Sequence, residues 1–189
     1  SVQITTSLRA DVLTVDVNNR STVSATAKLY AQKVTVDANN YSKFDASVHT
    51  TNRNLRVMED GMVVYNINNR SVVSGTVVTS TFVANANNYS DLNVGAECRD
   101  ARYVLTNRAK LKGNVAAHTL RMELNNYSDV RSNQIAFDQT DTAKCVVVDK
   151  RKVGRTVVMD DIEDLDCLIG RVTVVLDLDC NFIVCGKDI

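Results

Sequence analysis

A tetrapeptide of the form Asn-Asn-Arg/Tyr-Ser recurs along the chain, and no other feature of the sequence constrains the fold as strongly. The five copies begin at Asn18, Asn39, Asn68, Asn87 and Asn125. The last interval is twice as long as the one before it, and Thr106-Asn107-Arg108-Ala109, halfway along it, is a degenerate sixth copy. A period of this length predicts a solenoid, in which each short repeat stacks on the next one.

Apolar and polar residues alternate on both sides of each tetrapeptide, which is typical of strands with one buried face. Apolar residues stand five, three and one places before the first asparagine and five places after it, and small or slim residues stand seven places after it. The column five places before it holds Leu13, Val34, Val63, Phe82 and Leu120. We therefore predict two short strands per coil, joined at the Asn-Asn corner, with like residues stacked at the strand spacing of ~4.8 Å.

The whole chain, residues 1–189, is predicted to be one all-β domain, a single-stranded parallel β-helix. Regular coils are expected over residues 13–135 and degenerate coils over 136–189, where weaker corners lie near residues 149–151, 159–165 and 177–181. The count is about nine coils of about 20 residues, which gives a rod of ~40 Å. The longer interval between Asn39 and Asn68 predicts an insertion within Leu55–Met62, with a turn at Glu59-Asp60-Gly61.

Both asparagines of each corner are predicted to form ladders, in which each amide donates to the same side chain one coil away. Asparagine also tolerates the left-handed backbone that a sharp corner requires. The predicted ladder residues are Asn18, Asn19, Asn39, Asn40, Asn68, Asn69, Asn87, Asn88, Asn125 and Asn126. The second asparagine of each full copy also begins an Asn-x-Ser sequon, so glycosylation is an alternative use of Asn19, Asn40, Asn69, Asn88 and Asn126.

The third corner position alternates between arginine and tyrosine: Arg20, Tyr41, Arg70, Tyr89, Arg108 and Tyr127. Coils of about 20 residues would interleave guanidinium groups with phenol rings, which attract one another. Coils of double that length would stack arginine on arginine, which is unfavourable at strand spacing. We prefer the shorter coil. The stripe is then either a solvated face or a flat interaction surface, because tyrosine and arginine are enriched at interfaces.

Composition excludes several classes of partner. The formal net charge is zero, which argues against nucleic acid. No apolar run approaches the ~20 residues of a membrane span. The first residues carry no signal peptide pattern, so we expect that a signal is either lacking or already removed.

The cysteines and histidines give no strong chemical motif. The five cysteines are odd in number and contain no CxxC pair: Cys98, Cys145, Cys167, Cys180 and Cys185. We expect small buried residues, with one disulfide among the C-terminal cysteines as the alternative in an exported protein. His49 and His118 fall in different coils and are expected at the surface.

No catalytic constellation emerges, so we predict a protein that is not an enzyme and takes no cofactor. Asp160, Asp161 and Asp179 are weak candidates for calcium ligands, the alternative being that aspartate replaces asparagine at these corners. A polysaccharide lyase, a class that also occurs on parallel β-helices, is the enzymatic alternative.

The run from Leu13 to Thr26, with its corner Asn18-Asn19-Arg20-Ser21, resembles the repeat of the bacterial head GIN domain (autotransporter adhesin) family. The run from Val34 to Ala46 resembles it as well. That family repeats an alternating strand, a Ser-Gly-Ala-Ser corner, and then Val or Leu before a small residue. Here Gly-Ala is replaced throughout, and the last serine matches. The likeness covers residues 13–135 and implies a right-handed parallel β-helix in an exported, surface-associated or periplasmic protein without established enzymatic activity.

These observations favour a structural solenoid of the cell surface or extracellular space, used in adhesion or as a subunit of a fibre. A solenoid end exposes unpaired backbone groups, so we expect self-association or another protein chain at one end at least. A carbohydrate-binding module that uses the tyrosines of the stripe is the alternative binding function.

Overall fold

The computed structural model describes residues 1–52, 54, 56–131, 135–137, 144–150 and 171–176, and beyond residue 131 it describes the backbone alone. All regular secondary structure in these residues is β-strand, as the alternation predicts. The strands are β1 (Val2–Ile4), β2 (Leu8–Asn18), β3 (Thr22–Ala25), β4 (Leu29–Asn39), β5 (Lys43–His49), β6 (Met62–Ile67), β7 (Val72–Asn87), β8 (Asp91–Thr106), β9 (Lys110–Lys112), β10 (Val115–Asn125), β11 (Asp129–Arg131), β12 (Ile135–Phe137), β13 (Lys144–Lys150) and β14 (Arg171–Leu176).

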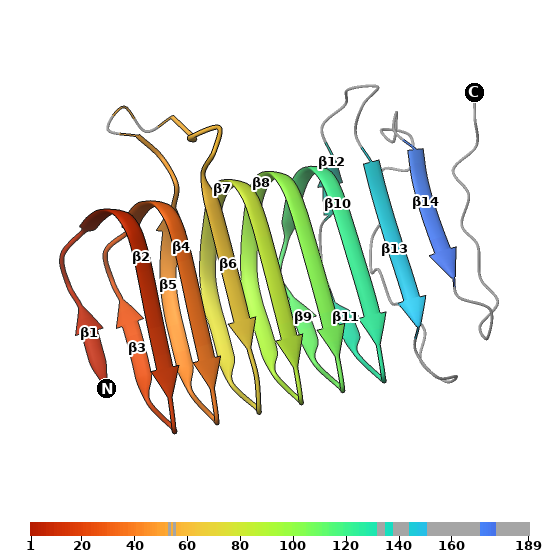
Figure 1. The fold of residues 1–189 in the computed structure, drawn as a ribbon, viewed down its shortest axis with the longest axis horizontal. Coiled ribbons are helices and arrows are strands. Elements are labelled where there is room, and N and C mark those ends of the chain that lie inside the picture. The colour runs from red at the N-terminus through yellow and green to blue at the C-terminus, as the bar shows by residue number, and fades with distance from the viewer. Residues whose placement is uncertain (53, 55, 132–134, 138–143, 151–170, 177–189) are drawn as a thin grey trace.

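The strands wind into a parallel β-solenoid (Figure 1). Every pairing between named strands is parallel. One side, the long face, holds β2, β4, β6, the second halves of β7 and β8, and then β10, β13 and β14. The opposite side, the short face, holds β1, β3, β5, the first halves of β7 and β8, and then β9 and β11. The chain descends the near face and climbs the far face as it advances from the N-terminus, so the coil is right-handed (Figure 1).

The number of coils is slightly smaller than predicted. The long face contains eight strands in the described residues, which make about seven turns rather than nine coils. β13 pairs directly with β14, with Cys145 opposite Val172, and the predicted corner near residues 159–165 lies outside the described residues. The step from Cys145 to Val172 is longer than a regular coil.

Inside the coil, like residues stack in the register that the sequence predicts. Leu13, Val34, Val63, Phe82, Ala101 and Leu120 are consecutive partners across the long face. Four of the interior rings also contact one another edge to face along the axis. Their centroids are 6.1 Å apart for Phe44 and Tyr65, 5.3 Å for Tyr65 and Phe82, and 5.6 Å for Phe82 and Tyr103. Burial of such side chains stabilises the coil by roughly 1.5–3 kcal/mol each.

The longer interval between Asn39 and Asn68 is explained by a loop. Tyr30 pairs with His49, a step of 19, whereas Lys33 pairs with Met62, a step of 29. Ten extra residues therefore lie between His49 and Met62, and the insertion begins earlier than predicted. It contains an isolated antiparallel bridge between Thr51 and Val57. It ends in the expected turn, where the Gly61 amide donates to the Met58 carbonyl at 3.0 Å.

The column of small residues marks a sharp bend in the short face. Gly75 has a φ of 123° and lies against the backbone of Ala46, its partner in the neighbouring coil. A Cβ at residue 75 would lie 1.9 Å from the Ala46 carbonyl oxygen. Gly113 has a φ of 137° and makes the same close approach to Val94. Small residues are required here because two backbones approach too closely for a side chain.

Candidate functional site

Each Asn-Asn corner is a tight turn with two consecutive left-handed residues. Asn19 and Arg20 have φ values of 56° and 63°, and the Ser21 amide donates to the Asn18 carbonyl at 3.3 Å. These are the features of a type I′ turn, for which asparagine is favoured at the first central position. The same paired values occur at Asn40 and Tyr41, Asn69 and Arg70, Asn88 and Tyr89, Asn107 and Arg108, and Asn126 and Tyr127. The degenerate sixth corner is therefore confirmed.

The second asparagines of the six corners form the predicted ladder. In every link the side-chain Nδ2 of one coil donates to the Oδ1 of the preceding coil. The distances are 3.2 Å for Asn40 to Asn19, 3.0 Å for Asn69 to Asn40, 3.0 Å for Asn88 to Asn69, 3.2 Å for Asn107 to Asn88 and 3.0 Å for Asn126 to Asn107. Four of the five sequon amides thus already donate a hydrogen bond, and a glycan on them would have to displace the ladder.

The first asparagines do not form a second ladder, which corrects that part of the prediction. Within the described residues, no hydrogen bond joins the side chains of Asn18, Asn39, Asn68, Asn87 and Asn125 to one another. Four of these residues end a strand and Asn68 directly follows β6, and in each corner the left-handed backbone begins only at the next residue. The Asn87 side chain instead accepts from Asn107 Nδ2 at 2.9 Å and from the Asn88 amide at 2.9 Å, so it bonds to the column of second asparagines.

The serine that ends the tetrapeptide closes the corner from inside. Ser42, Ser71, Ser90 and Ser128 are fully buried. The Ser42 hydroxyl donates to the Asn39 carbonyl, and the Ser42 amide donates to the Ser71 hydroxyl at 3.1 Å. Sequence reasoning missed this role, although the recurrence of serine in all five full copies was its signal.

Arginine and tyrosine interleave along the outside of the corners, and we call these six residues the Arg-Tyr stripe. The guanidinium carbons lie 5.3–5.8 Å from the centroids of the neighbouring rings. Arg70 Nη1 also donates to the Tyr41 hydroxyl at 3.2 Å, and Arg108 Nη1 donates to the Tyr89 hydroxyl at 2.9 Å. The stacking confirms the shorter coil and excludes a coil of double length.

The stripe is exposed but internally organised. Tyr41, Tyr89 and Tyr127 keep 51%, 49% and 45% of their surface accessible. The ring of Tyr41 lies between Arg20 and Arg70, and the ring of Tyr89 lies between Arg70 and Arg108. Both faces of these rings are therefore occupied, so a sugar cannot stack on them without displacing a guanidinium.

The arginines of the stripe have no acidic partner among the described residues. Ion pairs there join Arg99 with Asp100, Arg131 with Asp129, and both Arg102 and Arg121 with Glu123. Arg20, Arg70 and Arg108 occupy alternate coils, so their spacing along the axis is about 10 Å, twice the strand spacing. In the part of the chain that the structure describes, the stripe therefore presents three positive charges without an ion-pair partner.

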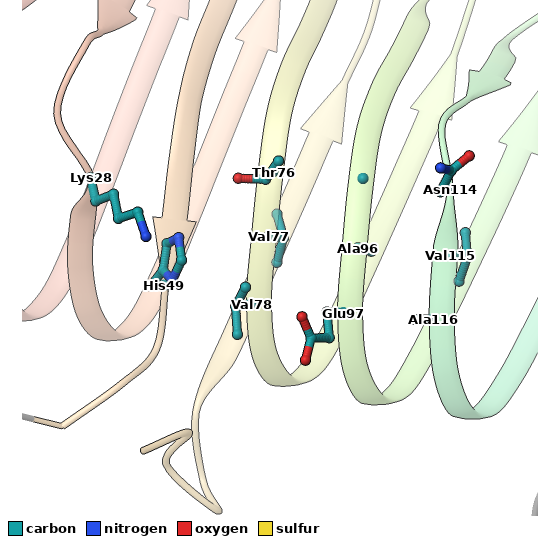
Figure 2. A pocket seen from close by; sticks show the side chains of 11 residues that line it. Lys28, His49, Thr76, Val77, Val78, Ala96, Glu97, Asn114, Val115 and Ala116 are labelled. Carbon is teal, nitrogen blue, oxygen red and sulfur yellow. The ribbon is translucent and has the colours of Figure 1, made fainter. Parts of the chain in front are cut away.

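A second candidate surface is an open depression of about 360 Å³ outside the bend that joins the two faces (Figure 2). Small and apolar residues of three neighbouring coils form its floor, among them Val78, Gly95 and Ala116. Lys28 reaches toward the ring of His49 at one end, and Glu97 lies two coils farther along, beyond Val78 (Figure 2). Burial, together with the nearby Lys28 ammonium, lowers the pKa of His49, although Glu97 opposes this. Sequence reasoning missed the depression because its lining comes from separate coils that share no motif.

The other predicted chemical groups are only partly described. Cys98 is a free, half-buried thiol, and burial with the nearby carboxylates of Asp100 and Glu97 raises its pKa to about 12. This fits the expected structural cysteine rather than a reactive one. Cys145 belongs to β13, and Cys167, Cys180 and Cys185 lie outside the described residues.

The weak calcium candidates Asp160, Asp161 and Asp179 also lie outside the described residues. In the part of the chain that the structure describes, no three side chains of the His, Cys, Asp and Glu types gather as a metal site. In the same part, no helix is long and apolar enough to cross a membrane.

Comparison of the chain with protein-family models, with curated proteins and with solved structures finds no match.

Proposed function

We propose that this protein is a non-enzymatic structural β-solenoid of the cell surface or extracellular space, which acts in adhesion or as a subunit of an assembly. The observation that carries the proposal is the Arg-Tyr stripe, a rigid and exposed row that spans six coils. Its side chains are held by one another and by the turns beneath them, so binding loses little conformational entropy. Tyrosine and arginine are also the residue types that most often anchor interfaces.

The first coil supports the assembly part of the proposal. Within the described residues, β2 pairs with β4 and β1 pairs with β3, and their other edges are unpaired. Leu13 and Val15 at this end are only partly buried, although their counterparts in the next coil are fully buried. An unpaired parallel edge above an open core is a template for a further strand. We propose that another chain, or a second copy, stacks on this end.

Two lysine substitutions on the same strand test end-to-end packing. Val15→Lys places a charge at the open end of the core, whereas Thr14→Lys places it on the outer surface of β2. Sedimentation velocity and negative-stain microscopy over a wide range of protein concentration should show larger, elongated species for the wild type and Thr14→Lys. Val15→Lys should remain smaller.

The adhesion part is tested with beads coated with the wild type or with the variant in which Arg20, Arg70 and Arg108 are changed to glutamine. Retention of the beads under flow on cell-surface and matrix coatings should depend on the stripe. A strictly monomeric wild type whose coated beads are retained no better than the variant contradicts the proposed function as a whole.

A further inference from the structure

The stripe carries a more specific inference, which rests on the proposed adhesive function. We propose that the Arg-Tyr stripe binds a linear acidic polysaccharide that carries one carboxylate in each disaccharide. The three guanidiniums of Arg20, Arg70 and Arg108 bind successive carboxylates, and the tyrosines between them hold the guanidiniums at a fixed spacing.

Charge is the first part of the argument. None of the three arginines has a carboxylate partner among the described residues, and each lies beside at least one ring. The column two residues beyond the stripe holds Lys43 and Lys110 together with Asp91 and Asp129, so it adds no net charge and the positive charge of this edge comes from the arginines. A guanidinium has five N–H donors, and the tyrosine hydroxyl uses one of them in Arg70 and in Arg108. The remaining donors are available for a carboxylate, which the planar fork of arginine binds well.

Spacing is the second part of the argument. Guanidiniums in alternate coils lie about 10 Å apart, twice the distance between strands. The disaccharide unit of an extended polysaccharide has the same length, so a chain laid along the stripe would bring one carboxylate to each arginine. Single-stranded nucleic acid fits less well, because its phosphates are closer together and its bases stack on open aromatic faces. The faces of Tyr41 and Tyr89 are covered by arginines.

Preorganisation is the third part. The corner beneath the stripe is fixed by the asparagine ladder and by hydrogen bonds between coils, such as Tyr41 N to Asn69 O at 2.9 Å and Arg70 N to Asn88 O at 2.9 Å. A row of charges with a fixed period discriminates between polymers by the spacing of their charges, whereas a flexible basic segment does not.

The binding experiment compares polymers that differ in charge spacing. Hyaluronan, with one carboxylate in each disaccharide, is titrated against the full chain at low ionic strength, beside polygalacturonate, dextran and oligothymidylate of similar length. Hyaluronan should bind most tightly and dextran should not bind. The complex should weaken as salt rises, because exposed charge pairs are screened.

Three variants separate spacing from net charge. Changing Arg20, Arg70 and Arg108 to glutamine should weaken hyaluronan binding on the order of tenfold or more. The charge-matched control changes Arg9, Lys33 and Lys112 to glutamine and should retain affinity. The exchange Arg70→Tyr with Tyr89→Arg keeps composition and net charge but breaks the two-coil period, and it should also weaken binding. Circular dichroism and the urea midpoint verify that each variant is folded.

Several outcomes would overturn the inference. These are no binding of hyaluronan, tighter binding of polygalacturonate or oligothymidylate, equal loss in the control variant, or no effect of the exchange. None of them removes the proposed function, which is judged separately by oligomeric state and by bead retention on the cell-surface and matrix coatings.

Discussion

Asn69 shows at the level of one residue how the corner motif stabilises the fold. Its side chain donates to Asn40 and accepts from Asn88, and its φ is 54°. Asn69→Gly keeps the left-handed backbone but loses both amide hydrogen bonds, so we expect a loss of about 1–2 kcal/mol in the free energy of unfolding. Asn69→Ala should cost about 1 kcal/mol more, because alanine is strained at this φ.

Urea denaturation measures both variants. Asn19→Gly is the matched control, because Asn19 makes one ladder hydrogen bond rather than two. Equal losses for residues 19 and 69 would mean that the ladder adds nothing beyond turn geometry.

Substitution of Tyr65 should stabilise the protein, in contrast to substitution of Asn69. The Tyr65 side chain is fully buried between Phe44 and Phe82, and its hydroxyl has no hydrogen-bond partner among the described residues. Burial also raises the pKa of this phenol, so the group stays neutral. Tyr65→Phe keeps the ring contacts and removes an unsatisfied polar atom, so we expect stabilisation by about 1 kcal/mol.

The urea midpoint of Tyr65→Phe is compared with that of Tyr41→Phe. Tyr41 is exposed and its hydroxyl accepts from Arg70, so its replacement should shift stability by no more than about 0.5 kcal/mol, toward lower stability. Destabilisation by Tyr65→Phe would indicate that the hydroxyl has a partner after all.

Residue types at the corner could be predicted because their physical demands are local. Two left-handed residues in a row favour asparagine, and stacked coils favour alternation of Arg and Tyr. The direction of each side chain was harder to predict. Sequence alone placed both asparagines of a corner, such as Asn39 and Asn40, in ladders, whereas the turn geometry selects the second one. The depression beside His49 depends on contacts between coils and leaves no local pattern.

Among the elements, β7 depends on a single glycine. Gly75 combines a φ of 123° with a potential Cβ contact of 1.9 Å to the Ala46 carbonyl oxygen. Gly75→Ala should therefore cost about 2–4 kcal/mol, from backbone strain and overpacking together. Gly95→Ala is the control, since the nearest atom to its Cβ would be Thr76 Cγ2 at 3.9 Å, and its effect should stay within about 1 kcal/mol. Thermal unfolding of the two variants should differ clearly, and similar midpoints would refute the bend constraint.

The inserted loop should be dispensable for the fold. His49 pairs with Val78 and Met62 with Thr81, and the coil above crosses this gap with Thr79 and Ser80. Deleting residues 51–60 leaves Thr50 and Gly61 to make the same two-residue connection. We expect the β-sheet circular dichroism to be unchanged and the free energy of unfolding to shift by about 1 kcal/mol or less.

Deletion of residues 82–91 is the control for the loop deletion. It also removes ten residues, but it eliminates the buried Phe82 and one corner, so it should abolish cooperative unfolding. If both deletions unfold the protein, the prediction is wrong and the inserted loop is needed for the fold.

In the whole molecule, stability should vary along the axis. Each coil contacts only its neighbours, so a coil covered on both sides is held more firmly than one covered on a single side. By hydrogen exchange, amides of β6 and β7 should exchange most slowly, and those of β1 and β2 fastest. If copies stack on the first coil, protection of β2 should rise with protein concentration while that of β6 stays constant. Uniform exchange along the rod would contradict this nearest-neighbour picture.

The architecture could be predicted over residues 13–131 because every coil repeats the same core columns and the same corner. Prediction was less accurate where the repeat weakens. Cys145 lies opposite Val172 across β13 and β14, a longer step than the coil of about 20 residues that the repeat predicts. The start of the insertion was similarly misplaced, because only pairing across coils fixes where the register changes.

The ladder has a direction, since every amide hydrogen points from a later coil to an earlier one. Its leading member, Asn19, therefore offers a donor that no described acceptor meets, and its trailing member, Asn126, offers a carbonyl oxygen. If two molecules met through their first coils, the donors of the two Asn19 side chains would face each other. If the first coil of one molecule met the last coil of another, the ladder of side-chain hydrogen bonds would continue across the junction. Any filament built by stacking these coils would be polar: its two ends would be chemically distinct, and they could grow at different rates.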